Sequence, residues 1–217
     1  VQVDLEIACG SVNMARLEQA LRNAEFDPDA QRIWRWVTDN EMPRMLVKFE
    51  LLADLDDQPA GVTVSFDGCD DLGAANLRGT GFAARDLEVR TLRSRIGGVE
   101  QQAEINVAGL AGFLLAKTAA AFERRKPKDW YDIAFVLLHN DAGGPDQAAA
   151  LVLNRFGLDL EGVRVALDDL AANFADIKAQ GPSAYADQIA IDHPEVNRAT
   201  ALADAVVAVQ SFRRRLV

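Results

Sequence analysis

Residues 114–138 read LLAKTAAAFERRKPKDWYDIAFVLL and hold the clearest periodic pattern in the chain. Alanine and leucine dominate its first half, and their high helix propensity predicts a helix over residues 108–125. Pro127 ends that helix, because proline has no backbone N–H to donate and clashes with the preceding turn. The apolar pattern then resumes and predicts a second helix over residues 129–140, ending near the glycine-rich turn at residues 143–145. This stretch therefore predicts two consecutive helices that meet at a basic corner.

Charged residues gather around this corner. Lys117 lies among small and apolar residues, while Arg124 and Lys128 flank the break between the helices. Asp129 and Asp132 follow at positions i and i+3, so they share one face of the second helix. A lysine within an apolar helix usually extends its ammonium group to solvent, although it can instead contact a phosphate as a point charge. Composition alone favours the solvent-exposed interpretation.

The pattern differs on the two sides of this stretch. Before it, alternating and β-favouring segments predict strands at residues 1–8, 33–37, 45–53, 62–66, 87–92 and 103–107. A helix is expected over residues 11–24 and a glycine-rich loop over residues 68–81. After it, helices are expected over residues 146–156, 160–178 and 197–216. The sequence thus predicts an α/β (α+β) domain over residues 1–105, followed by a helical domain over residues 106–217.

Two acidic residues lie within the predicted strands of the first domain. Asp4 occupies a polar position in the alternating segment VDLEI, and Glu50 interrupts the apolar segment VKFELL. If these two strands are neighbours, Asp4 and Glu50 could share one divalent cation, and carboxylate oxygens suit Mg²⁺ in nucleotidyl transfer. On residue pattern alone, a solvated face of the sheet is the simpler interpretation.

Composition narrows the class of protein further. Hydrophobic residues make up 49% of the 217 residues, which is enough for a sizeable core. The formal net charge of −10 argues weakly against broad nucleic-acid binding, while leaving room for a local basic patch. No apolar run reaches the roughly 20 residues of a membrane span, and two widely separated cysteines are typical of a reducing compartment. A cytoplasmic protein that does not bind membranes is expected.

The order of these motifs resembles a known family. Residues 117–120 (KTAA), a short basic loop and residues 128–133 (KDWYDI) resemble the C-terminal hallmark of the nucleotidyltransferase-like toxins of bacterial abortive-infection and toxin–antitoxin systems, the AbiEii/AbiGii type. Residues 3–5 (VDL) resemble the end of that family's metal motif, and residues 49–52 (FELL) its later acid-bearing strand. The resemblance implies a polymerase-β-like nucleotidyltransferase fold, with a mixed sheet flanked by helices and followed by a helical domain.

The same resemblance implies a function. The family transfers a nucleotide from an NTP to an acceptor, which is the 3′ end of tRNA for some members, and thereby inhibits bacterial growth. It implies Mg²⁺ as the cofactor, NTP and tRNA as ligands, and a cognate antitoxin protein as a partner. The residues assigned to catalysis are Asp4, Glu50, Lys117 and Asp129, with Asp4 and Glu50 as the metal ligands. The residues assigned to nucleotide binding are Lys117, Arg124, Lys128 and Asp132.

Two departures from the family pattern open an alternative. Gln2 stands where the first metal acid is expected, and an amide brings no negative charge to a metal. The family's Gly-Ser motif is absent before the metal strand, and Gly10-Ser11 after it is more simply a turn and helix cap. Either the N-terminal edge of the domain lies outside this sequence, or the chain is a catalytically degenerate member that binds nucleotide, RNA or protein. A third possibility is an interaction module whose helical half binds a partner.

Overall fold

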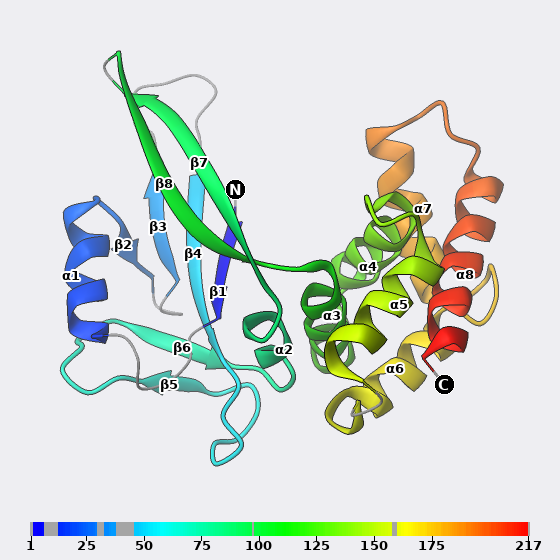
Figure 1. The fold of residues 1–217 in the computed structure, drawn as a ribbon, viewed down its shortest axis with the longest axis horizontal. Helices are drawn as coiled ribbons and strands as arrows, with labels where there is room; N and C mark the ends of the chain where they lie inside the picture. Colours follow the sequence, from blue (N-terminus) through cyan, green and yellow to red (C-terminus); the bar gives the residue numbers. More distant parts are fainter. Residues whose placement is uncertain are drawn as a thin grey trace. The chain divides into compact units, whose positions relative to one another are not determined.

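The fold is described from a computed structural model, which describes residues 2–6, 13–29, 33–37, 46–96, 98–157 and 160–216. The chain divides into two compact units, Val1–Gly81 and Phe82–Val217 (Figure 1). Residue 105, where the two predicted domains meet, lies within a strand of the second unit. The division comes earlier in the chain because the two strands that precede the helices pair with each other, so they form contacts within the second unit.

The first unit is built on a mixed sheet around one central strand. Its elements are β1 (Gln2–Glu6), α1 (Met14–Asn23), β2 (Asp27–Pro28), β3 (Trp34–Val37), β4 (Leu46–Ala53), β5 (Thr63–Ser65) and β6 (Gly73–Asn76). The sheet order is β2-β3-β4-β6-β5, and β1 also pairs with β4. Strands β1 and β6 run parallel to β4, whereas β3 runs antiparallel to it. The predicted mixed α+β character is therefore present.

Apolar side chains from α1 and the sheet form the core of this unit. Met14 and Leu21 of α1 pack in one buried cluster with Trp34, Leu51 and residues of the β6 region. Trp34 is fully buried, so this tryptophan is a core residue. The Asn13 side chain accepts a hydrogen bond from the Arg16 backbone N–H at 3.0 Å and caps the helix. The expected cap, Ser11, lies outside the described residues.

A buried carboxylate ties α1 to the loop before β6. Glu18 accepts the backbone N–H groups of Asp70 and Asp71 at 3.1 and 3.2 Å, and the guanidinium of Arg22 at 3.0 Å. Burial by itself raises the pKa of Glu18, but the hydrogen bonds from Arg22, Asp71 and Leu72 outweigh burial and hold that pKa below its usual value. The ionised side chain is therefore a structural anchor of the first unit.

A second polar anchor shapes the glycine-rich region that we expected to be a loop. Asn76 is fully buried, and its amide group donates to the carbonyl oxygens of Leu55, Gln58 and Pro59 at 3.0–3.1 Å. The loop prediction for residues 68–81 is wrong at Gly73–Asn76, which forms β6 between β4 and β5. Pairing with β4 and β5 on its two sides overrides the low β-propensity of glycine and asparagine there.

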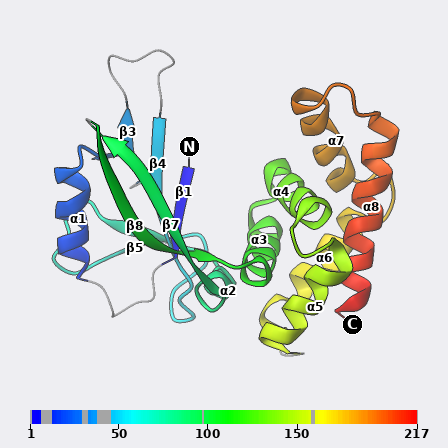
Figure 2. The same cartoon turned by 45° about the horizontal axis from the view of Figure 1, so that its top comes forward.

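The second unit combines a long hairpin with a bundle of helices (Figure 2). It contains β7 (Leu87–Ile96), β8 (Val99–Ala108), α3 (Leu110–Arg124), α4 (Pro127–His139), α5 (Pro145–Phe156), η1 (Glu161–Val163), α6 (Arg164–Asn173), α7 (Gln180–Asp192) and α8 (Arg198–Arg215). The short helix α2 (Gly81–Ala84) leads into it. Strands β7 and β8 pair antiparallel along their whole length, so both are longer than predicted. Helix α8 contacts α4, α5, α6 and α7, and their apolar faces form one continuous core.

One helix of the bundle is absent from the predictions. Residues 160–178 were expected to form a single helix, but the α-helix there is Arg164–Asn173, and a separate helix, α7, follows at Gln180–Asp192. Gly181 and Pro182 at the start of α7 are residues typical of a turn, so no helix was predicted there, although proline is tolerated in the first turn of a helix. A Cβ at Gly181 would lie 2.2 Å from the Phe174 ring, so glycine allows α7 to approach that buried ring. Across the described residues, every helix is too short or too polar to span a lipid bilayer.

Candidate functional site

The two predicted helices of the 114–138 stretch are present as α3 and α4, and a tight reversal joins them. Arg125 adopts a left-handed backbone conformation with φ of 53°, and its N–H donates to the carbonyl oxygen of Ala121 at 3.0 Å. Lys126 is extended and Pro127 starts α4, where the missing N–H of proline costs nothing. The reversal allows side chains near the end of α3 to meet those at the start of α4.

All five residues predicted at this corner lie together in one ionic cluster. The Lys117 Nζ atom is 2.8 Å from Asp132 Oδ2 and 3.2 Å from Asp129 Oδ1. Arg124 Nη2 lies 2.8 Å from the same Asp129 oxygen, and Lys128 Nζ lies 3.1 Å from Asp132 Oδ2. We call these five residues the Lys117 cluster. The solvent-exposed interpretation of Lys117 is wrong, because only 13% of its side chain is exposed.

The Lys117 cluster keeps unused hydrogen-bonding capacity. An ammonium group has three donors, and the two carboxylates account for two of those on Lys117. The Asp129 side chain is 3% exposed, and its Oδ2 atom has no hydrogen-bond partner among the described residues. Three other buried atoms of the same helix pair also have no hydrogen-bond partner within the described part of the chain, namely Thr118 Oγ1, Arg124 Nε and Trp130 Nε1. Three cations against two carboxylates leave one net positive charge, which suits an anionic ligand.

The two acids predicted on the sheet belong to neighbouring strands. Strands β1 and β4 pair parallel, and Asp4 is the register partner of Glu50. Asp4 and Glu50 therefore lie on adjacent strands, as a shared cation would require. Gln2 in turn pairs with Lys48 in the same register. Two carboxylates fit Mg²⁺, which commonly takes one or two protein carboxylates and completes its shell with water and substrate phosphates.

No larger metal cluster accompanies this pair in the part of the chain whose side chains are described. Within those residues, no group of three or more histidine, cysteine, aspartate or glutamate side chains is arranged to hold a metal ion. Asp4 and Glu50 belong to the first unit, and the Lys117 cluster belongs to the second. The metal and catalytic roles of Asp4 and Glu50 stay predictions.

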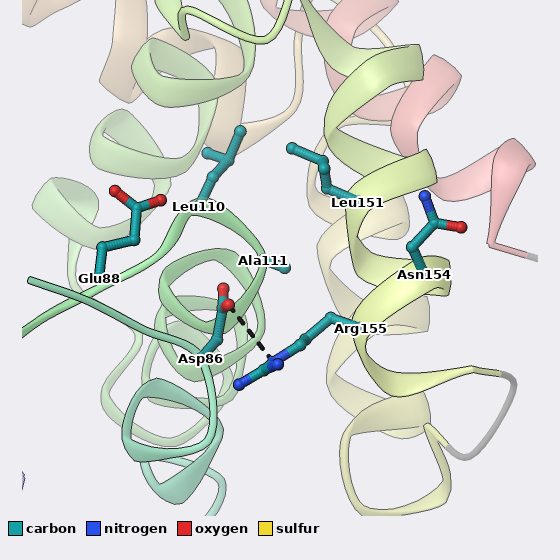
Figure 3. A pocket seen from close by; sticks show the side chains of 7 residues that line it. All are labelled: Asp86, Glu88, Leu110, Ala111, Leu151, Asn154 and Arg155. Carbon is teal, nitrogen blue, oxygen red and sulfur yellow. Dashed lines mark ion pairs between the residues drawn. The ribbon is translucent and has the colours of Figure 1, made fainter.

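A cavity of about 260 Å³ opens elsewhere in the second unit (Figure 3). It is lined by Asp86, Glu88, Leu110, Ala111, Leu151, Asn154 and Arg155. Asp86 accepts the backbone N–H of Gly112 at 2.8 Å and lies 3.5 Å from Arg155 Nε, so its carboxylate caps α3 and joins it to α5. None of the predicted site residues lines this cavity. Its Asp86–Arg155 pair serves the packing of the helices, and its Glu88 pairs with Arg90 on β7.

Aromatic residues beside the Lys117 cluster were not singled out from the sequence. Tyr131, Phe135 and His139 follow one another at intervals of four residues along α4, so they share a face. Lys128 and Asp132 lie on the same side of that helix, because they are three residues before Tyr131 and Phe135. The four-residue spacing of these rings is present in the sequence. It was missed because three different residue types lie at these positions within an otherwise apolar segment.

The first unit has the mixed α+β character, and the second unit the helices, that the resemblance to nucleotidyltransferase-like toxins implied. Comparison with known proteins supports the same class. The family model for the nucleotidyl transferase AbiEii toxin of type IV toxin–antitoxin systems matches residues 75–207. The chain therefore belongs to the AbiEii nucleotidyltransferase toxin family, which confirms the resemblance seen in the sequence. No curated protein and no solved structure matched the chain.

The matched range covers one of the two predicted sites. It includes every member of the Lys117 cluster, and it begins after Glu50. The family assignment thus bears on the helical corner directly, whereas the acids of β1 and β4 lie outside the match.

Proposed function

We propose that this protein is a Mg²⁺-dependent nucleotidyltransferase toxin that transfers a nucleotide from an NTP to RNA, with the 3′ end of tRNA as the acceptor. In this reaction the acceptor hydroxyl oxygen bonds to the α-phosphorus, the bond to the β-phosphate breaks, and pyrophosphate leaves. The observation that carries the proposal is the Lys117 cluster, whose central lysine is mostly buried and, among the described residues, pairs with two carboxylates, one fewer than its number of N–H donors.

Each member of the Lys117 cluster has a role in this proposal. Lys117 contacts the NTP phosphates, and Asp129 and Asp132 hold its ammonium group in place. Arg124 bonds to the same Asp129 oxygen as Lys117, while Lys128 is 72% exposed and can exchange its pair with Asp132 for a phosphate. Pre-oriented charges of this kind stabilise the charge that develops in phosphoryl transfer without reorganising during the reaction.

Asp4 and Glu50 would hold the Mg²⁺ ion in the same proposal. Their register on neighbouring strands supports this assignment. When bound, the ion supplies neutralisation of the triphosphate charge and lowers the pKa of the attacking hydroxyl. In this proposal, modification of tRNA inhibits bacterial growth. A cognate antitoxin protein counteracts the toxin. The reaction takes place in the cytoplasm, where NTPs and tRNA are found.

A transfer assay tests the proposal. Full-length protein is incubated with Mg²⁺, each α-labelled NTP in turn and total bacterial tRNA, beside Lys117→Ala. Lys178→Ala serves as a matched control, because Lys178 is an exposed lysine on the same unit and outside the cluster. We expect labelled RNA from the wild type and from Lys178→Ala, and at least a hundredfold less from Lys117→Ala. Equal labelling by all three proteins would refute the role of Lys117.

One observation favours a second candidate, a degenerate member that binds nucleotide without transferring it. Gln2 stands at the position of the first metal acid, and its register partner is the cation Lys48. A neutral amide next to a lysine brings little negative charge to this end of the strand pair. For this candidate, the wild type binds NTP but labels no RNA, and Gln2→Asp gains transfer activity. Robust transfer by the wild type, unchanged in Gln2→Asp, would eliminate it.

A further inference from the structure

An aromatic strip runs along α4 beside the Lys117 cluster. It consists of Tyr131, Phe135 and His139, with Tyr185 of the adjacent helix α7 behind it. The ring centroids of Tyr131 and Phe135 are 5.6 Å apart, and those of Phe135 and His139 are 4.7 Å apart. Helices α4 and α7 lie side by side, as Figures 1 and 2 both show. The strip is therefore a continuous row of rings along one helix.

The rings differ in their exposure to solvent, because Tyr185 is buried whereas Phe135 and His139 are exposed. Tyr185 is buried, stacks on Tyr131 with the ring planes at 23°, and its hydroxyl lies 3.2 Å from His139 Nε2. Phe135 is 37% exposed, and His139 is exposed as well. Tyr185 therefore contacts Tyr131 and His139 from the buried side, while Phe135 and His139 stay exposed to solvent.

The strip is bounded by charges of both signs. At its start lie Lys128 and Asp132, and the latter is bonded to Lys117. Asp132 is the next residue after Tyr131 on α4, and Asp192 lies at the end of α7, the helix that packs against α4. Burial raises the pKa of Tyr131, and the negative charges of Asp192 and Asp132 raise it further. These carboxylates disfavour an anionic membrane surface on the strip, whereas they can accept hydrogen bonds from the amino groups of a nucleobase.

We propose that the aromatic strip binds the base of the NTP whose phosphates contact Lys117, and this inference rests on the function proposed above. Lys128 and Phe135 are seven residues apart on one helix, which corresponds to about 10 Å along its axis. The surface therefore offers a cation, then a carboxylate, then exposed rings. That order suits a ligand with an anionic tail and a flat aromatic head, which is the chemistry of a nucleotide. Stacking on Phe135 would tolerate different bases, because every base has a π face.

The experiment compares two kinds of ligand that share a triphosphate chain, namely NTPs, which carry a base, and inorganic tripolyphosphate, which has none. Isothermal titration calorimetry measures the dissociation constants of each of the four NTPs and of inorganic tripolyphosphate, with Mg²⁺ present throughout. The proteins are the wild type, Phe135→Ala, Phe135→Trp and Lys117→Ala, with Val207→Ala as the control. Val207 is an exposed apolar residue on α8, outside the strip. Circular dichroism spectra establish that each variant is folded.

The expected results separate the base from the phosphates. Phe135→Ala should weaken NTP binding about fivefold to a hundredfold and leave tripolyphosphate binding within twofold of the wild type. Phe135→Trp should bind NTP at least as well as the wild type, because a larger ring replaces phenylalanine. Lys117→Ala should weaken both ligands, and Val207→Ala should weaken neither.

Two different failures remain distinguishable. If Phe135→Ala binds NTP like the wild type while Lys117→Ala weakens both ligands, the strip does not bind the base and the phosphate role of Lys117 stands. An equal loss for both ligands in Phe135→Ala also overturns the inference, because the ring then only supports the helix. If the wild type binds neither ligand, or Lys117→Ala binds both normally, the proposed function itself fails.

Discussion

Replacing Asp129 with asparagine should destabilise the second unit more than the same change at Asp132. Asparagine keeps the shape of the side chain, so the difference reports charge rather than a cavity. Asp129 is 3% exposed and bonds to two cations, Lys117 and Arg124. Hydrogen bonds to charged groups contribute about 1.5–3 kcal/mol each, and breaking a buried ion pair costs about 3–5 kcal/mol. Since Lys117 retains Asp132 as a partner, we expect a loss of about 3 kcal/mol for Asp129→Asn.

Asp132→Asn should cost less. Asp132 is 19% exposed, and one of its partners, Lys128, lies mostly in solvent, where such a pair contributes about 0.3–0.5 kcal/mol. Its other partner, Lys117, keeps Asp129. We therefore expect a loss of about 1–2 kcal/mol for Asp132→Asn.

Urea denaturation followed by far-ultraviolet circular dichroism is the appropriate assay, because the helices of the second unit dominate that signal. Adding Lys117→Met to Asp129→Asn should recover part of the loss, since it removes a cation that has lost one of its partners. The reasoning would be refuted if Asp132→Asn cost as much as Asp129→Asn, or if the Asp129→Asn loss were below about 1 kcal/mol.

Three further predictions concern glycine packing and the polar anchors of the first unit. Gly112→Ala should destabilise by about 2–3 kcal/mol, because its Cβ would lie 2.6 Å from a backbone carbonyl oxygen of α2. Gly162→Ala, which meets nothing within 4 Å among the described residues, should be neutral or slightly stabilising when both glycine variants are compared by thermal unfolding. Asn76→Asp should cost at least about 3 kcal/mol in urea denaturation, because a carboxylate would face three carbonyl oxygens. The pKa of Glu18 is lowered in the folded state, so its ionised form adds stability above the unfolded value near 4.5. The stability gap between wild type and Glu18→Gln should therefore hold at neutral pH and shrink as the pH falls below 4.5. A stability difference between the two proteins that increased as the pH fell would contradict this prediction.

Local pattern alone was sufficient for the helical corner. Helix propensity and Pro127 determine the two helices that the structure has as α3 and α4. The spacing of Asp129 and Asp132 determines their shared face, because a helix repeats every 3.6 residues. These features depend on residues within a few positions of one another, and the family match covers this stretch.

Features that depend on distant residues were decided by the tertiary structure. The strand Gly73–Asn76 exists because β4 and β5 pair with it, although its composition is typical of a loop. Helix α7 packs closely against Phe174 because Gly181 has no Cβ to block the approach. The adjacency of Asp4 and Glu50 is a matter of strand register, which links residues far apart in the chain. Lys117 became a buried, doubly paired cation for the same reason. Whether a charge meets solvent or a carboxylate depends on which helix packs against it, and packing between elements is not encoded in the periodicity of either one.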